Sequence, residues 1–494
     1  MLSPSGKRLL IVSNRLPVNI SGAEDDWTIH PSSGGLITAL EPLVRRCRGT
    51  WLGWPGCSSE APLSGLLREF SDRQEYTLKP VVISEEEIEK YYLGFSNRTI
   101  WPLFHDLLGH CTFNSEHWEY YQRVNERFAR EIAKLIDGDD FVWIHDYQLM
   151  LVGHFLRGMG VDVRLNFFLH IPFPSCDLLK RLPWRQEIMH SLLEYDHVGF
   201  QTTNDRRNFI QCLKRLAPEA PVKKYKRKAE VLVEGRTVRL GTYPISIDYN
   251  EFNDFAGSND VADAAWYIHE NLPDLRLMLG IDRLDYTKGI PERFLAFERA
   301  LEKYPDLRGK MALVQIVVPS RLHVPEYQHL KGELDALSGR INARFSSQGW
   351  VPIHYMFREL SRTQLLGYYR ACEIAIITPL RDGMNLVSKE YCASSIDNNG
   401  ILILSEFAGA ADQLSKGALM VNPYDCEVTA DAIYAAFIME PEERQRRMKT
   451  LRAEVRRNNV QRWIEWFMES DTVGHEAVDE QAESPAEQPV SHTR

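Results

Sequence analysis

The feature that most constrains this sequence is a series of continuous apolar runs separated by segments of helical periodicity. Eight such runs are LLIVSN, FVWIHD, LNFFLHIPF, HVGFQT, LMLGIDRL, LVQIVVPS, EIAIITPL and ILILSEF. Runs that are apolar throughout are typical of parallel strands in a sheet covered on both faces. Between them, the segment 291–305 begins with Pro291 and places Phe294, Phe297 and Leu301 on one helical face. The sequence therefore predicts a doubly wound α/β fold.

The series of strands and helices starts afresh near 241–253, after a basic segment that reads as a hairpin. For a chain of 494 residues we therefore expect two Rossmann-like domains with the ligand cleft between them. The expected domains are 1–242 and 243–455, followed by a C-terminal helix at 456–471 that packs back toward the first domain. The tail at 472–494 is acidic and poor in large apolar residues, a composition typical of disorder.

Composition excludes several classes of function. A formal net charge of -10 argues against binding to nucleic acid or to an acidic membrane, because phosphate backbones are held mainly by basic surface. The N-terminal apolar run is short and leads directly into a predicted strand, so we expect neither a signal peptide nor a membrane span. The eight cysteines include no CxxC pair, which suits reduced thiols in a cytoplasmic enzyme. A homo-oligomer is compatible with these features.

Polar residues follow several of the predicted strands. Because the carboxyl ends of parallel strands line the ligand crevice of a doubly wound sheet, we expect these groups to converge on one site. They are Ser13, Asn14 and Arg15; His145 and Asp146; His170; Arg283, Asp285 and Lys288; Ser320 and Arg321; and Arg381 and Asp382.

A metal site is not expected. The segment DGDD (137–140) formally contains the DxD motif of metal-dependent transferases. It precedes the strand FVWI, however, which places it at the edge of the sheet opposite the ligand crevice. We interpret it as a solvated turn.

At this stage the motifs resemble a known family. SNRLPV, SSGGL, WLGWPG, YYLGFSNRTIWPLFH, WIHDYQL, FFLHIPFP, IDRLDYTKGIPERFLAFE, PSR, TPLRDGMNLVSKEY and SEFAGAA occur in one order from about residue 8 to about 468. Together they closely resemble the trehalose-6-phosphate synthases of glycosyltransferase family 20. The resemblance implies two facing Rossmann-like domains, the GT-B arrangement. The N-terminal domain would bind the acceptor and the C-terminal domain the nucleotide sugar.

The implied reaction transfers glucose, with retention of the α configuration, from a nucleoside diphosphate glucose to glucose 6-phosphate. The products would be α,α-trehalose 6-phosphate and the nucleoside diphosphate. The family needs no metal or other cofactor, so protein cations must neutralise the leaving diphosphate. Arg283 and Lys288 in RLDYTKG match the family's diphosphate-binding pair, and two fixed cations at a developing negative charge can replace Mg²⁺. Gly34 and Gly35 match the loop that lies against the same diphosphate, where glycine allows close backbone approach.

The stretch TPLRDGMNLVSKEY (378–391) matches the family's clamp on the donor sugar. Asp382 matches the group that binds sugar hydroxyls, and Glu390 matches the carboxylate that accepts both ribose hydroxyls. Leu360 lies at or near the contact with the nucleotide base, in a loop whose sequence departs from the usual family pattern. The backbone groups implied to contact sugar and diphosphate belong to Gly383, Met384, Asn385, Leu386 and Val387.

On the acceptor side, the resemblance implies a phosphate held by guanidinium groups and a pyranose ring held by aromatic walls. The acceptor-binding residues are Arg15, Trp54, Tyr92, Trp101, Asp146 and Arg321, with Trp54 the weakest match. The implied catalytic residues are Asp146, His170, Arg283, Lys288 and Asp382. Retaining glycosidases use two close carboxylates, but no second carboxylate matches here. The implied route is a front-face displacement in which the departing phosphate oxygen helps to take the acceptor proton.

Other functions remain as alternatives. A glucosylglycerol-phosphate synthase or a cyclitol-coupling pseudo-glycosyltransferase would share the donor half, but the full acceptor set favours the trehalose interpretation. An epimerase of this fold would leave Arg15 and Arg321 without a phosphate, and a regulatory subunit would be expected to lose donor residues. UDP-glucose is the expected donor, with GDP- and ADP-glucose as alternatives.

Overall fold

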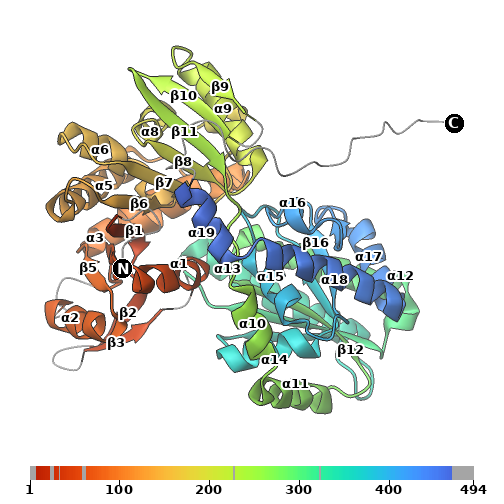
Figure 1. Cartoon of the computed structure of the whole chain (residues 1–494). Helices are drawn as coiled ribbons and strands as arrows, with labels where there is room; N and C mark the ends of the chain where they lie inside the picture. The colour runs from red at the N-terminus through yellow and green to blue at the C-terminus, as the bar shows by residue number, and fades with distance from the viewer. Residues whose placement is uncertain are drawn as a thin grey trace.

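Two α/β domains lie side by side in the computed structural model (Figure 1). The residues that it describes are 7–22, 27–32, 34–57, 63–225, 228–321 and 324–469. The expected acidic tail, 472–494, lies outside these described residues. Among them, no helix is both long enough and apolar enough to cross a membrane.

The N-terminal domain is built on a nine-stranded sheet. Its strands, in spatial order, are β5 (Thr77–Pro80), β4 (Thr50–Trp54), β1 (Leu9–Arg15), β6 (Phe141–His145), β7 (Leu165–Leu169), β8 (His197–Phe200), β11 (Arg236–Thr242), β10 (Lys228–Val233) and β9 (Val222–Lys224). The first seven are parallel, whereas β10 pairs antiparallel with both of its neighbours. A separate hairpin joins β2 (Val18–Ser21) to β3 (Thr28–Pro31). This sheet is therefore mixed, and the basic segment forms the expected hairpin at its edge.

The C-terminal domain is built on a six-stranded, wholly parallel sheet. Its strands, in spatial order, are β14 (Ile353–Phe357), β13 (Met311–Val318), β12 (Arg276–Arg283), β15 (Ile374–Ile377), β16 (Ile401–Ser405) and β17 (Leu419–Val421). All eight apolar runs form strands, and the predicted doubly wound fold is confirmed.

Helices cover both sheets (Figure 1). Those of the N-terminal domain are α1 (Gly35–Arg46), α2 (Leu63–Gln74), α3 (Glu85–Glu87), α4 (Trp101–Phe104), α5 (Ser115–Leu135), α6 (Val152–Gly158), α7 (Cys176–Leu179), α8 (Arg185–Leu192) and α9 (Thr203–Leu216). The later helices are α10 (Tyr249–Ala256), α11 (Asn259–Asn271), α12 (Ile290–Lys303), α13 (Pro325–Phe345), α14 (Arg362–Ala371), α15 (Leu386–Ser394), α16 (Ala411–Leu414), α17 (Cys426–Ile438), α18 (Pro441–Arg457) and α19 (Val460–Glu469). A π-helix, η1 (Ile88–Ile100), precedes α4, and short 3₁₀ turns are η2 (Leu108–His110), η3 (Tyr147–Leu149), η4 (Tyr286–Lys288) and η5 (Pro305–Leu307).

The helix predicted at 291–305 is α12. It begins one residue earlier, with Pro291 in its first turn, and buries Phe294, Phe297 and Leu301 as their spacing predicts. The buried face packs against the second sheet, in a core shared with α13 and α17.

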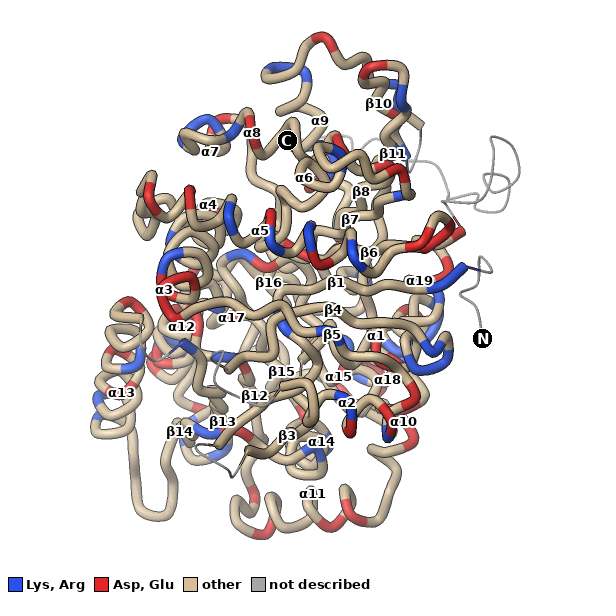
Figure 2. The backbone as a smooth tube through the Cα atoms, turned by 90° about the vertical axis from the view of Figure 1, so that its left-hand side faces the viewer, with Lys and Arg blue, Asp and Glu red and all other residues tan. Residues whose placement is uncertain are grey.

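Basic and acidic residues alternate along the chain in both domains, as Figure 2 shows, and in this view they form no continuous basic face over the described residues. Many are paired within a helix, such as Arg446 with Glu443 in α18 at 2.7 Å. The absence of nucleic-acid binding, expected from the net charge, stays a prediction.

The chain crosses between the domains twice. The first crossing is Tyr243 to Asp248, and the second leads from α18 into α19. The two are tied together, because the Val460 N–H donates to the Ile247 carbonyl at 2.9 Å. We propose a domain division at 242/243, with Tyr243 to Asp248 and the entry to α19 as the hinge.

After this crossing, α19 lies beside β6 and β7 of the N-terminal domain (Figure 1). Phe467 is fully buried, and its ring stacks on Trp143 of β6 with centroids 4.5 Å apart. It also stacks on His197 of β8 at 4.4 Å. This aromatic cluster ties the end of the chain to the first domain.

Replacing Phe467 with alanine should therefore destabilise the protein by about 3–5 kcal/mol, the range for truncating a buried phenylalanine. Chemical unfolding monitored by fluorescence measures the change. Glu465→Ala, an exposed position on the same helix, is the matched control and should stay within about 0.5 kcal/mol of the parent. Equal effects of the two substitutions would show that α19 is not anchored by this cluster.

Candidate active site

The carboxyl ends of the two sheets face each other, and the domains touch there. The Arg321 guanidinium, from the segment after β13, lies 4.8 Å from the ring centroid of Trp101 in α4. His110 stacks on Tyr286 with centroids 4.5 Å apart. Arg98 lies 3.8 Å from Glu326 across the same boundary. The cleft between the domains is therefore closed in this structure.

Two glycines permit the closest approach of the domains. A Cβ atom on Gly383, in the loop after β15, would lie 2.2 Å from the His170 carbonyl oxygen of the N-terminal domain. A Cβ atom on Gly35 at the start of α1 would lie 2.6 Å from the Leu386 side chain at the start of α15. The carbonyl cannot move aside, so Gly383 must be glycine when the cleft is closed, whereas at Gly35 the Leu386 side chain would have to shift.

The centre of the C-terminal half of the site is an ion pair. Lys288 Nζ lies 2.6 Å from Asp382 Oδ2, and both groups are largely buried. Although burial opposes it, the Lys288 ammonium holds the pKa of Asp382 below its ordinary value. Asn385 Nδ2 donates to the same carboxylate oxygen at 3.3 Å. Arg283, at the end of β12, is exposed. Burial tends to raise the pKa of the neighbouring Asp285, but Arg321 and Lys288 lower it, with a smaller contribution from Arg283.

The helix α15 begins inside the site. Asn385 caps it, because its side-chain oxygen accepts the Ser388 N–H at 3.1 Å while its own backbone has a φ of 77°. Glu390 lies one turn further and accepts a hydrogen bond from the Tyr369 hydroxyl at 2.8 Å. Burial raises the pKa of Glu390. Leu360, after β14, packs against the hydrophobic core. The N-terminus of α15 thus lies in the site, and helix N-termini favour anions.

The predicted acceptor residues form one aromatic and cationic cluster. The Arg15 guanidinium lies 4.6 Å from the Trp54 ring, and Trp54 meets Tyr92 edge to face at 5.9 Å. Tyr92 belongs to the π-helix η1, a type of helix that often marks functional sites. Burial opposes it, but the guanidinium groups of Arg321 and Arg15 lower the pKa of the Tyr92 hydroxyl. Arg15 of the N-terminal domain and Arg321 of the C-terminal domain therefore both direct positive charge at the Tyr92 hydroxyl.

Arg321 is held on its own side by two neighbours. Its guanidinium donates to the Tyr327 hydroxyl at 2.6 Å and lies 3.7 Å from Asp285. Among the described residues Arg15 has no such carboxylate, and its side chain donates to Asn19 at 3.1 Å. Burial lowers the pKa of Arg15. Arg321 is thus neutralised in part, whereas Arg15 is a partly exposed cation with a neutral partner.

Asp146 and His170 follow the neighbouring strands β6 and β7. The His170 N–H donates to Asp146 Oδ1 at 3.1 Å. Burial raises the pKa of Asp146 to about 7 and lowers that of the His170 imidazole to about 3. Asp146 has a φ of 76° and a ψ of 169°, a region almost reserved for glycine, and such strain is typical of active sites. Asp146, His170 and the His170 carbonyl beside Gly383 therefore line the N-terminal side of the cleft.

Comparisons with known proteins agree with this geometry. The family model described as Glycosyltransferase family 20 matches residues 7–471. The chain belongs to glycosyltransferase family 20.

Relatives of this family 20 chain cover most of its length. It is 42% identical over 469 residues to the trehalose-6-phosphate synthase of Mycolicibacterium smegmatis, covering 93% of this chain and 92% of the relative. It is 39% identical over 462 residues to the "Alpha,alpha-trehalose-phosphate synthase [UDP-forming] A" of Dictyostelium discoideum. That alignment covers 92% of this chain but 61% of the longer relative. These relatives confirm the predicted enzyme class, a glycosyltransferase of the trehalose-phosphate synthase type.

Solved structures of the family share the whole fold. An enzyme from Burkholderia xenovorans in complex with glucose-6-phosphate is 35% identical, with a TM-score of 0.84 over 94% of this chain and 99% of that one. An E. coli protein bound with UDP-2-fluoro glucose is also 35% identical, with a TM-score of 0.83 over 94% and 98% of the two chains. The expected pair of facing domains with a cleft between them is therefore confirmed.

Some residues of the site were not foreseen. Gln201 follows β8 and contacts His170, and it obeys the same strand-end rule that selected the other polar groups. Lys389 is buried in α15 and donates to the Ile245 carbonyl at 2.7 Å, which no pattern in the sequence indicates. His105 is buried against Trp101, its Nδ1 lies 2.7 Å from the Trp101 carbonyl, and burial lowers its pKa to about 4.

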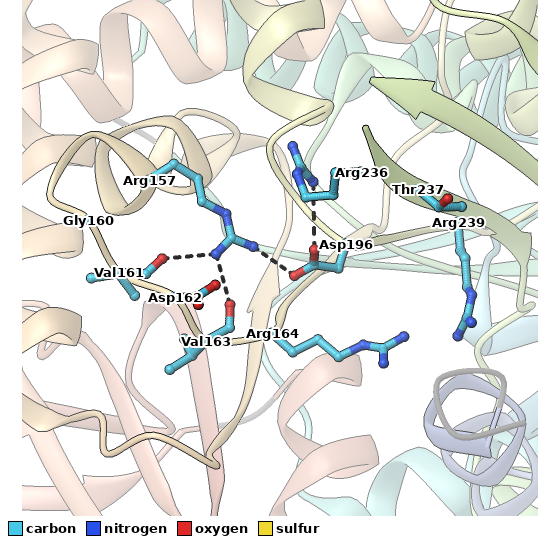
Figure 3. A pocket seen from close by; sticks show the side chains of 10 residues that line it. All are labelled: Arg157, Gly160, Val161, Asp162, Val163, Arg164, Asp196, Arg236, Thr237 and Arg239. Carbon is cyan, nitrogen blue, oxygen red and sulfur yellow. Dashed lines mark hydrogen bonds and ion pairs between the residues drawn. The ribbon is translucent and has the colours of Figure 1, made fainter. Parts of the chain in front are cut away.

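A surface pocket of about 610 Å³ lies away from this site, at the amino ends of β7, β8 and β11 (Figure 3). Arg157 and Arg236 both reach Asp196 there, at 2.8 and 3.6 Å. Arg157 also donates to the carbonyls of Val161 and Val163. These bonds hold the strand ends together, so we regard this pocket as structural.

No group of three or more His, Cys, Asp or Glu is arranged to hold a metal ion in the part of the chain that the structure describes. The DGDD turn precedes β6, as expected, and its Asp140 pairs with Arg8. Asp140 is thus engaged at the edge of the sheet opposite the cleft.

The strain at Asp146 has a measurable consequence. Asp146→Gly removes about 1–3 kcal/mol of strain, which exceeds the roughly 0.5–1 kcal/mol that glycine costs through chain entropy. Asp146→Ala keeps the strain. The glycine variant should therefore unfold at the higher temperature of the two by calorimetry, while both lose most of the activity. An alanine variant as stable as the glycine variant would contradict the strained backbone.

Proposed function

We propose that this chain transfers glucose from UDP-glucose to glucose 6-phosphate with retention of configuration, giving α,α-trehalose 6-phosphate and UDP. The observation that carries the proposal is the pair Arg15 and Arg321, which approach Tyr92 from different domains. A ligand that spans the cleft can use both cations, and a phosphorylated sugar is such a ligand.

The acceptor half favours a sugar phosphate over a neutral sugar. Arg15 is a partly exposed cation whose partner among the described residues is an amide, so its charge remains available to a ligand phosphate. Guanidinium groups bind phosphate oxygens through paired hydrogen bonds. Trp54 and Trp101 supply apolar faces for the pyranose ring. The complex of the Burkholderia xenovorans relative with glucose-6-phosphate supports this choice.

The donor half favours a nucleotide sugar. Lys288 and Arg283 provide positive charge where the diphosphate would leave, and the first turn of α15 adds backbone N–H groups. Asp382 is poised for sugar hydroxyls, while Glu390 is placed one turn along α15 for the ribose. The binding of UDP-2-fluoro glucose by the E. coli relative supports UDP-glucose. In this account the transfer requires no metal.

The carboxylates of the site favour a front-face displacement. Asp382 is engaged by Lys288 and Asn385, so it is poorly placed to attack the anomeric carbon. Asp146 has a raised pKa and accepts the His170 N–H. We infer that Asp146 orients the acceptor and that the departing phosphate oxygen takes the acceptor proton. The cations then stabilise the charge on the leaving group.

The reaction itself is tested by incubating the protein with glucose 6-phosphate and, in turn, UDP-, GDP- and ADP-glucose, and identifying the product by NMR. We expect an α,α-1,1-linked disaccharide phosphate, formed best from UDP-glucose and undiminished by EDTA. Glycerol 3-phosphate in direct competition is the control for acceptor identity. If the enzyme used glycerol 3-phosphate in preference to glucose 6-phosphate, glucosylglycerol-phosphate synthesis would replace the proposal. If EDTA abolished activity and Mg²⁺ restored it, the metal-free account would be refuted.

Arg321→Ala separates acceptor binding from donor binding. Charge-assisted hydrogen bonds contribute roughly 1.5–3 kcal/mol, so the KM for glucose 6-phosphate should rise about 10- to 150-fold. The KM for the donor should stay within about threefold of the parent. Arg340→Ala is the matched control, because Arg340 pairs with Glu298 at 2.7 Å outside the cleft. An equal loss of donor binding would assign Arg321 to the diphosphate instead.

A further inference from the structure

The side chain of Gln201 joins the domain hinge to His170. Gln201 follows β8, is 2% exposed, and its Oε1 lies 2.9 Å from the backbone nitrogen of Ile245 in the first crossing segment. Its Nε2 lies 3.4 Å from Nδ1 of His170. On the far side of His170, Nε2 lies 3.1 Å from Nδ1 of His145. The carboxyl ends of β6, β7 and β8 are thus linked by one line of hydrogen bonds.

The Ile245 N–H fixes which atoms donate and which accept along this line of hydrogen bonds. The Ile245 N–H can only donate, so the amide oxygen of Gln201 must face it and the Gln201 NH₂ must face His170. Ile245 is also held from the other domain, because Lys389 Nζ donates to its carbonyl at 2.7 Å. The amide of Gln201 is therefore oriented by a peptide that both domains fix in place.

The tautomer of His170 is then determined. Since the Gln201 NH₂ donates to Nδ1 of His170, Nδ1 carries a lone pair and the single proton of the neutral ring lies on Nε2. That Nε2–H donates to Nδ1 of His145. The proton of His145 consequently lies on its own buried Nε2, for which the described residues offer no hydrogen-bond partner. In this tautomer the Nε2–H of His170 is a hydrogen-bond donor, engaged here by His145, and the Nδ1 lone pair is engaged by Gln201 and is not available as a base.

We propose that Gln201 is a positioning residue that holds His170 in the Nε2–H tautomer, so that His170 meets the donor sugar as a neutral hydrogen-bond donor. On binding, the sugar would compete with Nδ1 of His145 for the hydrogen bond from the Nε2–H of His170. The catalytic part of this inference rests on the proposed glucosyl transfer, whereas the tautomer belongs to the protein without substrate. Through Ile245, the orientation of His170 is tied to the hinge.

Gln201→Glu tests the proposal with almost no change of shape. One carboxylate oxygen still accepts the Ile245 N–H, but the other now accepts from His170, which must carry a proton on Nδ1. In protein labelled with ¹⁵N-histidine, the two-bond N–H correlations of His170 distinguish the two tautomers, and His170→Asn assigns its signals. We expect Nε2–H in the parent and a protonated Nδ1 in Gln201→Glu. We expect kcat to fall roughly tenfold or more, the direction seen when a catalytic histidine is held in the wrong tautomer, with both KM values within about threefold.

Asn125→Asp is the control, because Asn125 is a fully buried amide that bonds Tyr121 and Leu151 away from the cleft. It should leave the His170 signals unchanged, whatever it does to stability. The proposal is overturned if the parent protein shows a protonated Nδ1 on His170, or if Gln201→Glu changes neither tautomer nor kcat. If Gln201→Glu does not fold, the parent spectrum and Gln201→Met, which should release His170 into a mixture of tautomers, still decide. The ligand-free spectra test Gln201 even if the product assay overturns the proposed reaction.

Discussion

The rest of the site depends on one contact between backbones, that of Gly383 with the carbonyl of His170. The two backbones are so close that a Cβ atom on Gly383 would lie 2.2 Å from the carbonyl oxygen. This close approach brings the loop after β15 against the strand ends of the N-terminal sheet, so that both border the cleft. Asp382 precedes the glycine, so the contact brings it to the side of the cleft where the His170 N–H donates to Asp146. In the closed arrangement these groups lie together, as expected of an enzyme that excludes water from an activated sugar.

The electrostatics of the closed cleft follow from burial. Lys288 and Asp382 lie 2.6 Å apart with little exposure, while Arg15 lacks a described carboxylate and Arg321 shares one. Carboxylates therefore compensate Lys288 and part of the charge on Arg321, whereas Arg15, where an acceptor phosphate would lie, keeps a neutral partner. In a low-dielectric site such fixed charges stabilise charge in the transition state without reorganisation. The imidazoles of His145 and His170 stay neutral, because burial lowers both of their pKa values.

Much of this arrangement follows from the sequence, because strand ends are recognisable. Arg15, Asp146 and Arg321 were located by the rule that polar residues after parallel strands converge, and Gln201 obeys it too. The strain at Asp146 was not foreseeable, because a φ of 76° is imposed by tertiary structure. Nor was the attachment of the expected hairpin to the N-terminal sheet through β11 and β8, since a hairpin in sequence does not reveal which sheet it extends. The burial of Lys389 likewise depends on a hinge peptide 144 residues away. The assignments of single residues to donor and acceptor came from family resemblance and remain predictions.

The most direct test of the central claim is the solution shape and activity of Gly383→Ala. The added methyl group has no room in the closed cleft but fits when the domains part, so the variant should fold and keep its thermal stability. Small-angle scattering in the presence of both substrates should then show the parent becoming more compact and the variant staying extended, with kcat/KM reduced by at least about 10². A variant that closes and turns over like the parent would contradict the account, because the site would then not require backbone contact between its domains.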